Sequence, residues 1–568
     1  MSHRIDPKAR STAAHCAAVL LGLCLWVMTP LSAQGQLTQA PDPQAMARRV
    51  LGDDPGTAAV AVWRDGALLQ ATVRRDAADA AGPAKVVPGG AAPPLFEIGS
   101  ISKIFTGLLL AQAVERGDVS LDDTLGRLLR GKLSFASPKV EGITLRQLVT
   151  HSACLPRQFG EVRLGRALVD QLRKTDHIDL MGVLADQKID ATPPCAALYS
   201  NYGMALLGEL LSEFYGKSWD DLVTERITGP LAMRDTLLHL GTQSPRLAPA
   251  FSGRSGASPW LMDAFAGAGG LRSSAQDLVT LGRALLQGGS GPLGAAAERL
   301  LTPLGVYQGR EIGYAVFIHG PASRRTYSHD GLTGGFRASL ILSPDTGEVV
   351  VALVSNAQAP LSDMTRGWWA SRYPVSGQVM AIDAATLAQL AAVYRIDDDQ
   401  ELTVVSDAGA LYVRSRGNVF RAYVPVAPDT FIRAAGGVRI TFERDGQQVR
   451  GLTLEQAGSR VLATRTAQTS PQQAVLRDGL ASAYVGRFVL ANPAGPLIAF
   501  DVRDEDGQLM VRSTRFAWEP VWPMAGRTDR FRYNIPDAEL QFERDPSGQV
   551  VALVLYQRGE LRALRVAK

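Results

Sequence analysis

Residues 96–103 read Phe-Glu-Ile-Gly-Ser-Ile-Ser-Lys and lead into an apolar segment with helical spacing that ends at Gly117. Glycine is a common residue just past a helix end, so we expect a helix over 101–116. Ser100 and Lys103 would then lie one turn apart on one face. A serine needs a base to become a nucleophile, and a partly buried lysine with a lowered pKa can be that base. Taken alone, the motif also fits a helix-capping serine followed by a solvated lysine.

Two further motifs lie downstream of this one. Tyr199-Ser200-Asn201 stands just before an apolar helical segment over 202–215. A Tyr-x-Asn turn can present a phenol that relays a proton and an amide that holds a substrate carbonyl. His329-Asp330-Gly331 opens a glycine-rich strand that continues through Leu332. Glycines there allow a ligand to lie along the strand and add its own backbone to the sheet edge.

Together these motifs carry a family resemblance over residues 56–375. The segment resembles the class C β-lactamase family of serine hydrolases, which includes D-Ala-D-Ala carboxypeptidases, D-aminopeptidases and some esterases. Ser-x-x-Lys is a signature of penicillin-recognising enzymes. The resemblance also extends to framework segments outside the three motifs, namely Ile143-Thr-Leu-Arg-Gln-Leu-Val-Thr-His151, Leu155-Pro156 and Gly269-Gly270-Leu271.

The resemblance implies a role for each motif residue. Ser100 would be the acylated nucleophile, Lys103 its base, and Tyr199 the group that passes a proton to the leaving group and activates the deacylating water. Asn201 would contact a substrate amide. The glycine-rich strand would bind substrate through His329, Gly331 and Leu332. The backbone N–H groups of Ser100 and Leu332 would form the oxyanion hole.

Two features depart from the family's β-lactamases. Those enzymes usually carry Lys-Thr-Gly where this chain has His329-Asp330-Gly331. Histidine has an ordinary pKa near 6.5 and is only partly charged at neutral pH, which lowers the expectation of efficient β-lactam hydrolysis. His-x-Gly is similar to the motif of family D-aminopeptidases and esterases. The second departure is Cys154 and Cys195, which flank the motifs and can form either a disulfide or two buried free thiols.

The predicted activity is acyl transfer through Ser100 to water, on amide or peptide bonds that involve D-amino acids. The alternatives are an esterase or β-lactamase with the same machinery, and a penicillin-binding sensor that acylates without turnover. His177, His239 and His319 show no metal-ligand spacing, so we expect neither a metal nor a cofactor. His151 lies in a framework segment, which favours a structural role. The expected partner is a small-molecule or peptide substrate, which includes peptidoglycan-derived material. The sequence is compatible with a monomer or a homo-oligomer.

Composition excludes several other classes of protein. The 568 residues include 59 Lys plus Arg and 55 Asp plus Glu, a net charge of +4. A nucleic-acid binder would normally show a basic face or stripe, so no nucleic-acid partner is expected. Apolar residues make up 46% and charged residues 20%, which is ordinary globular usage and excludes disorder for most of the chain.

The first 33 residues are typical of a signal peptide. Basic residues open the chain, an apolar run covers 17–31, and Ser32-Ala33 provides a small-residue cleavage site. The run has about 15 residues, fewer than the roughly 20 that span a bilayer, although an uncleaved anchor is the alternative. We therefore expect a periplasmic or secreted protein with no membrane association beyond this segment.

The rest of the chain divides into three predicted domains. Residues 34–380 have alternating strand patterns at both ends, including hairpins over 56–73 and 336–355, around a helical middle. This predicts an α+β fold, an α/β sandwich with an antiparallel sheet of the β-lactamase/transpeptidase type. Residues 383–466 and 474–568 consist of short strands and turns, and each is expected to form a small all-β barrel.

The two barrel segments are copies of one unit. Phe442-Glu-Arg-Asp445 recurs as Phe542-Glu-Arg-Asp545. Further matches keep the same order: Gly409–Ser415 with Gly507–Ser513, Leu452–Gly458 with Leu553–Gly559, and Tyr394-Arg395 with Tyr484–Arg487. Arginines scattered through the repeats, such as Arg414 and Arg512, are expected on a solvated face.

Overall fold

The computed structural model describes residues 42–77, 84–88, 92–158, 172–195, 198–307 and 309–396, and most of 400–566 with short gaps. The predicted signal peptide, residues 1–33, lies outside the described residues. No helix in the described part of the chain is both long enough and apolar enough to cross a membrane.

The first domain is built on a nine-stranded antiparallel sheet in the order β3-β2-β1-β13-β12-β11-β10-β9-β8. Its strands β1 and β13 are rich in Ala and Val and are buried along almost their whole length, as expected for strands covered on both faces of a sheet. Both predicted hairpins are confirmed. The strands are β1 Gly56–Arg64, β2 Ala67–Arg75, β3 Lys85–Val86, β8 Gly305–Tyr307, β9 Arg310–Ile312, β10 Phe317–His319, β11 Thr326–Leu332, β12 Arg337–Ser343 and β13 Glu348–Val354.

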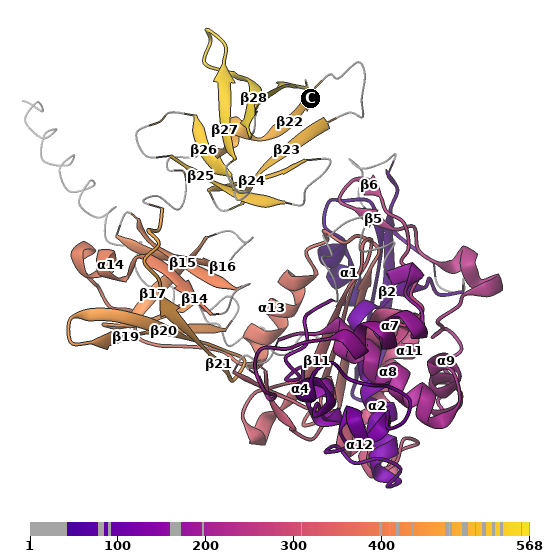
Figure 1. The fold of residues 1–568 in the computed structure, drawn as a ribbon. Helices are drawn as coiled ribbons and strands as arrows, with labels where there is room; N and C mark the ends of the chain where they lie inside the picture. The colour runs from indigo at the N-terminus through magenta and orange to yellow at the C-terminus, as the bar shows by residue number, and fades with distance from the viewer. Residues whose placement is uncertain are drawn as a thin grey trace, which may run out of the picture. The chain divides into compact units, whose positions relative to one another are not determined.

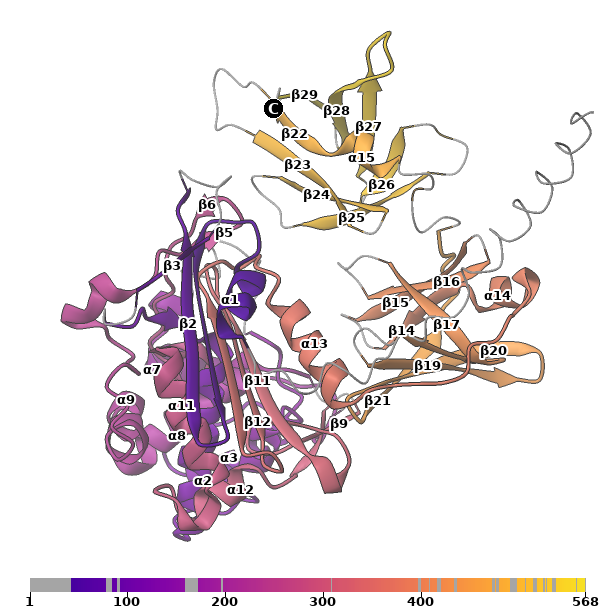
Figure 2. The ribbon, with the colours of Figure 1, turned by 180° about the vertical axis from the view of Figure 1, so that it is seen from behind.

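Helices cover both faces of this sheet (Figures 1 and 2). One face packs against a large helical layer, and that layer holds the main core cluster. In the described part of the chain, the other face packs against α1 and α13 around a smaller core. The principal helices are α1 Pro43–Leu51, α2 Ser102–Glu115, α5 Leu145–Val149, α7 His177–Asp186, α8 Asn201–Tyr215, α9 Trp219–Val223, α10 Ala266–Gly269, α11 Ala275–Leu286, α12 Ala295–Leu300 and α13 Leu361–Arg372.

Helix ends follow the signals in the sequence, with one exception. Past α2 and α8, Gly117 and Gly216 adopt positive φ values of 75° and 62°. The sequence Ser274-Ala-Gln-Asp277 predicts a capping box at the start of α11, but only half of it is formed. Ser274 Oγ accepts the backbone N–H of Asp277 at 3.2 Å, but the Asp277 carboxylate does not return the bond. It accepts instead from the backbone N–H of Asp235 and the hydroxyl of Thr236, so a tertiary contact replaces the local one.

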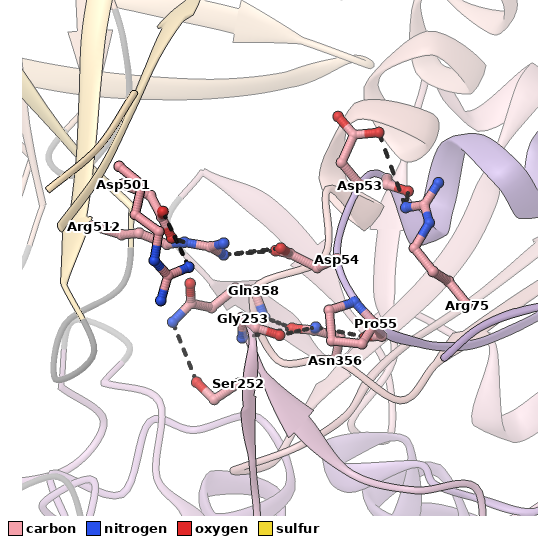
Figure 3. Close-up of polar contacts among 12 residues, drawn as sticks. Asp53, Asp54, Pro55, Arg75, Ser252, Gly253, Asn356, Gln358, Asp501 and Arg512 are labelled. Carbon is pink, nitrogen blue, oxygen red and sulfur yellow. Dashed lines mark hydrogen bonds and ion pairs between the residues drawn. The ribbon is translucent and has the colours of Figure 1, made fainter. Parts of the chain in front are cut away.

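A buried asparagine ties the end of the central strand to its neighbours (Figure 3). Asn356 follows β13 and is fully buried. Its Nδ2 donates to the carbonyl oxygens of Pro55 and Gly253 at 2.9 and 2.7 Å, and its Oδ1 accepts from the Gly253 N–H at 3.0 Å. The amide thus joins the segment before β1 to a distant loop.

Residues beyond 383 form two closed eight-stranded antiparallel barrels, which confirms the predicted all-β architecture. Each barrel has its own core cluster. Short helices α14 Ala384–Leu390 and α15 Ala481–Tyr484 precede them. The first barrel contains β14 Ala392–Arg395, β15 Glu401–Asp407, β16 Ala410–Ser415, β17 Arg421–Ala427, β18 Thr430–Arg433, β19 Val438–Asp445, β20 Gln448–Gln456 and β21 Ser459–Arg465. The second contains β22 Gly486–Leu490, β23 Ile498–Glu505, β24 Gln508–Ser513, β25 Glu519–Pro523, β26 Arg530–Tyr533, β27 Glu539–Arg544, β28 Val550–Tyr556 and β29 Glu560–Arg565.

The repeated Phe-Glu-Arg-Asp motif occupies the same place in both barrels. The N–H of Phe442 donates to Asp429 O, and the N–H of Phe542 donates to Asp529 O, each at 2.8 Å. The pairing register shifts within both motifs, after Glu443 and after Glu543, as in a β-bulge.

The structure corrects the expected match of Tyr394 with Tyr484. Tyr394 on β14 lies opposite Arg465, whereas Phe488 on β22 lies opposite Arg565. The rings of Tyr394 and Phe488 also contact the repeated phenylalanine of their own barrel, each at 5.7 Å between centroids. Phe488 is therefore the counterpart of Tyr394, while Tyr484 lies on the preceding helix.

The expectation that Arg414 and Arg512 lie on a solvated face is wrong, because both are buried. Arg414 lies over the ring of Phe420 at 5.1 Å. Arg512 donates to the Asp501 carboxylate at 3.1 Å (Figure 3). Its guanidinium group also lies over the ring of Trp518. Charge pairing and ring contacts compensate for loss of water around these guanidinium groups.

Candidate active site

Ser100 lies in the 3₁₀ turn Gly99–Ile101 that leads directly into α2. The strand before it, β4 Phe96–Glu97, pairs with β7 Arg272–Ser273, so the turn is held at the surface of the helical layer. Helix α2 is buried along most of its length, which fixes its first turn. Ser100 itself is half-buried and stays accessible.

Lys103 occupies the first turn of α2 and is fully buried. Its Nζ lies 3.0 Å from Ser100 Oγ, 2.8 Å from Asn201 Oδ1 and 2.5 Å from the carbonyl oxygen of Ala268. Burial lowers the pKa of Lys103 well below its ordinary value, and the nearby cation of Arg157 lowers it further. A neutral amine that donates to the Asn201 and Ala268 oxygens directs its lone pair at the Ser100 hydroxyl.

Tyr199 stands two residues before the start of α8 and lies beside both Ser100 and Lys103. Its hydroxyl is hydrogen-bonded to Ser100, and its ring centroid lies 4.9 Å from Lys103 Nζ. Burial raises the pKa of the Tyr199 phenol above its ordinary value, although the hydrogen bond to Ser100 opposes this effect. A phenol that keeps its proton near neutral pH can donate that proton to a leaving group.

Asn201 is the first residue of α8, which Ser200 caps by accepting the N–H of Gly203 at 2.8 Å. The family resemblance implies that Asn201 contacts a substrate amide, which stays a prediction, and in the structure its Oδ1 accepts a hydrogen bond from Lys103. The other acceptor for Lys103 is the carbonyl oxygen of Ala268, which the sequence motifs do not predict. A backbone carbonyl cannot be recognised from the side chain of its residue. Only the framework match Gly269-Gly270-Leu271, directly after Ala268, pointed to this segment.

Strand β11 brings the third motif against the nucleophile turn. A Cβ on Gly331 would lie 1.9 Å from the carbonyl oxygen of Ile98, and a Cβ on Gly99 would lie 2.8 Å from the N–H nitrogen of Leu332. The two backbones can approach so closely only because both residues are glycine. The N–H of Leu332 therefore lies next to the Ser100 turn.

His329 on the same strand is buried and neutral. Burial lowers its pKa to about 3. Its Nδ1 lies 2.8 Å from Asp330 O, so Nδ1 carries the proton and Nε2 is left as an acceptor. Its ring lies 6.4 Å from that of Tyr199 and 5.3 Å from that of Phe317.

Cys154 and Cys195 are joined by a disulfide in the structure, with their Cα atoms 5.3 Å apart. The bond connects the loop after α5 to the segment that leads into Tyr199.

Three residues near Tyr199 had no catalytic or binding role in the sequence analysis. His151 is buried and its ring lies 4.4 Å from that of Tyr199. Tyr307 on β8 lies 6.4 Å from the same ring, and the Arg157 guanidinium lies 4.9 Å from it. The framework segments that end at His151 and at Pro156 were the sequence signals for this neighbourhood.

The arrangement around Ser100 consists of side chains and backbone of this chain. The Ser100 hydroxyl contacts a buried amine on one side and a phenol on the other, beside a backbone N–H. Such a set of groups can supply the nucleophile, the base and the proton donor that serine acyl transfer requires. Within the described residues, no group of three or more His, Cys, Asp and Glu side chains could hold a metal ion.

The comparison with protein families agrees with the fold and the motifs. The family model described as Beta-lactamase matches residues 47–373, more than half of the chain. The chain belongs to this family of serine hydrolases, whose fold matches the predicted α+β class.

Individual relatives are more distant. Penicillin-binding protein 4 of Amycolatopsis lactamdurans is 28% identical over 296 residues, covering 48% of this chain and 74% of that protein. A penicillin-binding protein of Bacillus subtilis (strain 168) is 24% identical over 405 residues, covering 66% and 88%. The D-alanyl-D-alanine-carboxypeptidase/endopeptidase AmpH of Escherichia coli (strain K12) is 32% identical over 190 residues, covering 33% and 47%.

Proposed function

We propose that this protein is an exported serine hydrolase that forms an acyl-enzyme through Ser100 and cleaves amide or peptide bonds involving D-amino acids. The observation that carries the proposal is the buried Lys103 amine, 3.0 Å from Ser100 Oγ with two oxygen acceptors for its N–H groups. Relatives named as penicillin-binding proteins and as a D-alanyl-D-alanine-carboxypeptidase/endopeptidase support the substrate class. The signal-like N-terminal sequence supports export.

In the proposed acylation step, Ser100 Oγ attacks the substrate carbonyl carbon and its proton passes to the neutral Lys103 amine. The N–H groups of Ser100 and Leu332 stabilise the oxyanion, a contribution typically worth about 10²–10³ in rate per donor. Tyr199 then gives its proton to the leaving nitrogen and recovers one from Lys103. The C–N bond breaks, the amine departs, and the acyl group stays on Ser100.

Deacylation uses the same groups in the reverse direction. Water attacks the ester carbonyl, and its proton passes through Tyr199 and Lys103 as Ser100 Oγ leaves. No metal or cofactor is needed in this scheme because the nucleophile, the base and the proton donor all come from the chain.

His329 bears on the choice of substrate. A neutral imidazole offers no cation to a substrate carboxylate, whereas an ammonium group at that position would. We therefore place uncharged amide and ester substrates ahead of β-lactams, whose carboxylate would lack this partner.

The test is an intact-mass time course of the mature protein with benzylpenicillin, with Ser100→Ala as control, alongside turnover of D-alanyl amides, short acyl esters and a chromogenic cephalosporin. We expect turnover of the amides that Ser100→Ala abolishes while its circular dichroism spectrum is unchanged. Turnover by Ser100→Ala would overturn the proposal. A penicillin adduct that persists, without turnover of any substrate, would instead identify a sensor.

A further inference from the structure

Residues 151–157 run alongside the segment that carries Tyr199. Backbone N–H groups of Cys195 and Leu198 donate to the carbonyl oxygens of Ser152 and His151, each at 3.0 Å. Farther along, the N–H of Asn201 donates to Arg157 O at 2.9 Å. The Cys154–Cys195 disulfide closes this pairing covalently. Residues 151–157 are thus bonded at several points to the segment that carries the Tyr-x-Asn turn.

His151 binds the two residues on either side of Tyr199. Its carbonyl accepts the N–H of Leu198, and its ring Nδ1 accepts the N–H of Ser200 at 3.3 Å. Its ring also lies against the phenol ring, 4.4 Å between centroids and tilted by 36°. Nδ1 can accept only if it is unprotonated, and burial lowers the pKa of His151 well below its ordinary value.

The backbone of this segment is strained at two positions. His151 has φ 59° and Cys154 has φ 61°, in the left-handed region where side chains other than glycine or asparagine are uncommon. Such conformations persist where their surroundings over-determine them, and they cluster at functional sites. Here the hydrogen bonds to residues 195–201 and the disulfide supply those constraints.

We propose that residues 151–157, bonded to the Tyr199 turn through His151 and closed by the Cys154–Cys195 disulfide, are a positioning element that holds the Tyr199 phenol against Ser100. His151 and the disulfide act through Tyr199 and are positioning residues with no contact to the reacting bond. The inference rests on the proposed function for its effect on rate, although the placement of the phenol can be measured independently.

The first experiment removes the disulfide in the full chain with the double variant C154G/C195A, in which glycine suits the left-handed φ at position 154. We expect kcat for a D-alanyl amide to fall about tenfold while KM changes less than twofold, because misplacing a proton donor slows chemistry without weakening binding. In a Tyr199→Phe background the same change should cost less than twofold, because the phenol is already absent.

The second experiment compares two substitutions of His151. Asparagine keeps an acceptor near the place of Nδ1 and tolerates positive φ, whereas alanine does neither. We expect H151N to retain most of kcat and H151A to lose about tenfold. His177, which pairs with Glu209 elsewhere, provides the matched control, and H177N should behave as wild type.

The third measurement needs no activity. The ultraviolet difference between each protein and its Tyr199→Phe form reports ionisation of this one phenol. With the element intact, Tyr199 should stay protonated at pH 10.5, and in C154G/C195A a substantial fraction should ionise.

Equal kcat losses with and without the Tyr199 hydroxyl, or an unchanged phenol titration in C154G/C195A, would overturn the inference. Failure of wild type to turn over any substrate would refute the proposed function, and the titration would still decide whether the element positions Tyr199. If C154G/C195A does not fold, its measurements are replaced by those on H151A and H151N. These two variants are then compared in kcat and in the same phenol titration. Equal kcat and equal phenol titration in H151A and H151N would then overturn the inference.

Discussion

At the scale of single residues, the site depends on where protons lie before substrate arrives. The lowered pKa of Lys103 and the raised pKa of Tyr199 have the same main cause, burial, but with opposite consequences. Burial disfavours the charged form of each group, so it favours the neutral amine and the protonated phenol. One group is thereby a base and the other an acid, as a step that both removes and delivers a proton requires.

This assignment predicts the pH dependence of acylation. Protonated Lys103 cannot accept the Ser100 proton, so the acylation rate should fall as pH decreases through the pKa of Lys103. Because that pKa is lowered, the midpoint should lie well below the 10.5 of an ordinary lysine. Stopped-flow acylation by an activated ester between pH 5 and 10 measures it. A rate that is still rising steeply at pH 10 would contradict the prediction.

Replacement of the base provides a second check. Lys103→Met should slow acylation by at least about 10³-fold, since the serine loses its proton acceptor. Methionine has a similar length and no charge to bury, so the unfolding free energy should change by less than about 2 kcal/mol. Chemical denaturation measures the latter. A large loss of stability would mean that the lysine contributes to the fold more than to the chemistry.

At the scale of elements, the approach of β11 to the turn before α2 determines the oxyanion site. Gly99→Ala would place a Cβ 2.8 Å from the Leu332 nitrogen, so we expect kcat to fall about 10²–10³-fold as this donor is displaced. Gly117→Ala is the control. Gly117 also has a positive φ, +75°, so alanine there causes the same kind of backbone strain. A Cβ at Gly117 would have no other atom within 4 Å, so this substitution should leave kcat unchanged. Similar kcat values for the two variants would contradict this account.

Strand β10 carries a histidine whose neutral state contributes to stability. Burial, with a smaller effect from Arg310, lowers the pKa of His319 to about 3, and its Nε2 bonds Ser328 Oγ at 2.8 Å. Between pH 6.5 and 3 the unfolded chain therefore binds one more proton than the folded one at this residue, so stability falls as pH falls. His319→Gln can keep the bond to Ser328 and should flatten this dependence. Denaturation curves at pH 7.5, 6, 5 and 4 check it, and parallel loss in both proteins would contradict it.

The elements that sequence predicts well are those with local signals. The helix over 101–116, the helix that begins near 202 and both hairpins have periodic apolar residues and glycine or turn residues at their ends. Contacts between distant segments carry no such signal. The half-formed cap at Ser274 and the binding of Asn201 to Lys103 depend on neighbours about 40 and 100 residues away, and the hydrogen bonds of His151 to the Tyr199 turn are equally non-local.

At the scale of the whole molecule, the three predicted domains have separate cores. The hydrolase core, the first barrel core and the second barrel core share no residue. We propose that the boundaries near 380 and 470 divide the chain into three units that unfold independently. The sequence repeat then provides paired positions at which to test each barrel by itself.

The repeated arginine offers this test. Arg444 Nε donates to Asp429 Oδ1 at 2.8 Å in the first barrel, and Arg544 makes the same bond to Asp529 in the second, at 2.9 Å to Oδ2. Each pair is partly buried and ties the end of one strand to the turn before another. Loss of either pair should cost its own barrel about 1 kcal/mol, which for a domain of about 85 residues lowers Tm by about 4–8 °C.

Differential scanning calorimetry of the full chain should therefore show one transition shifted in Arg444→Ala, a different one shifted in Arg544→Ala, and both shifts in the double variant. Arg450→Ala is the matched control in the first barrel, because its pairing with Asp445 is exposed to solvent. A single transition that either substitution shifts as a whole would contradict independent unfolding. In that case the barrels would stabilise the hydrolase domain directly, and substitutions in them would alter the thermal inactivation of Ser100 chemistry as well.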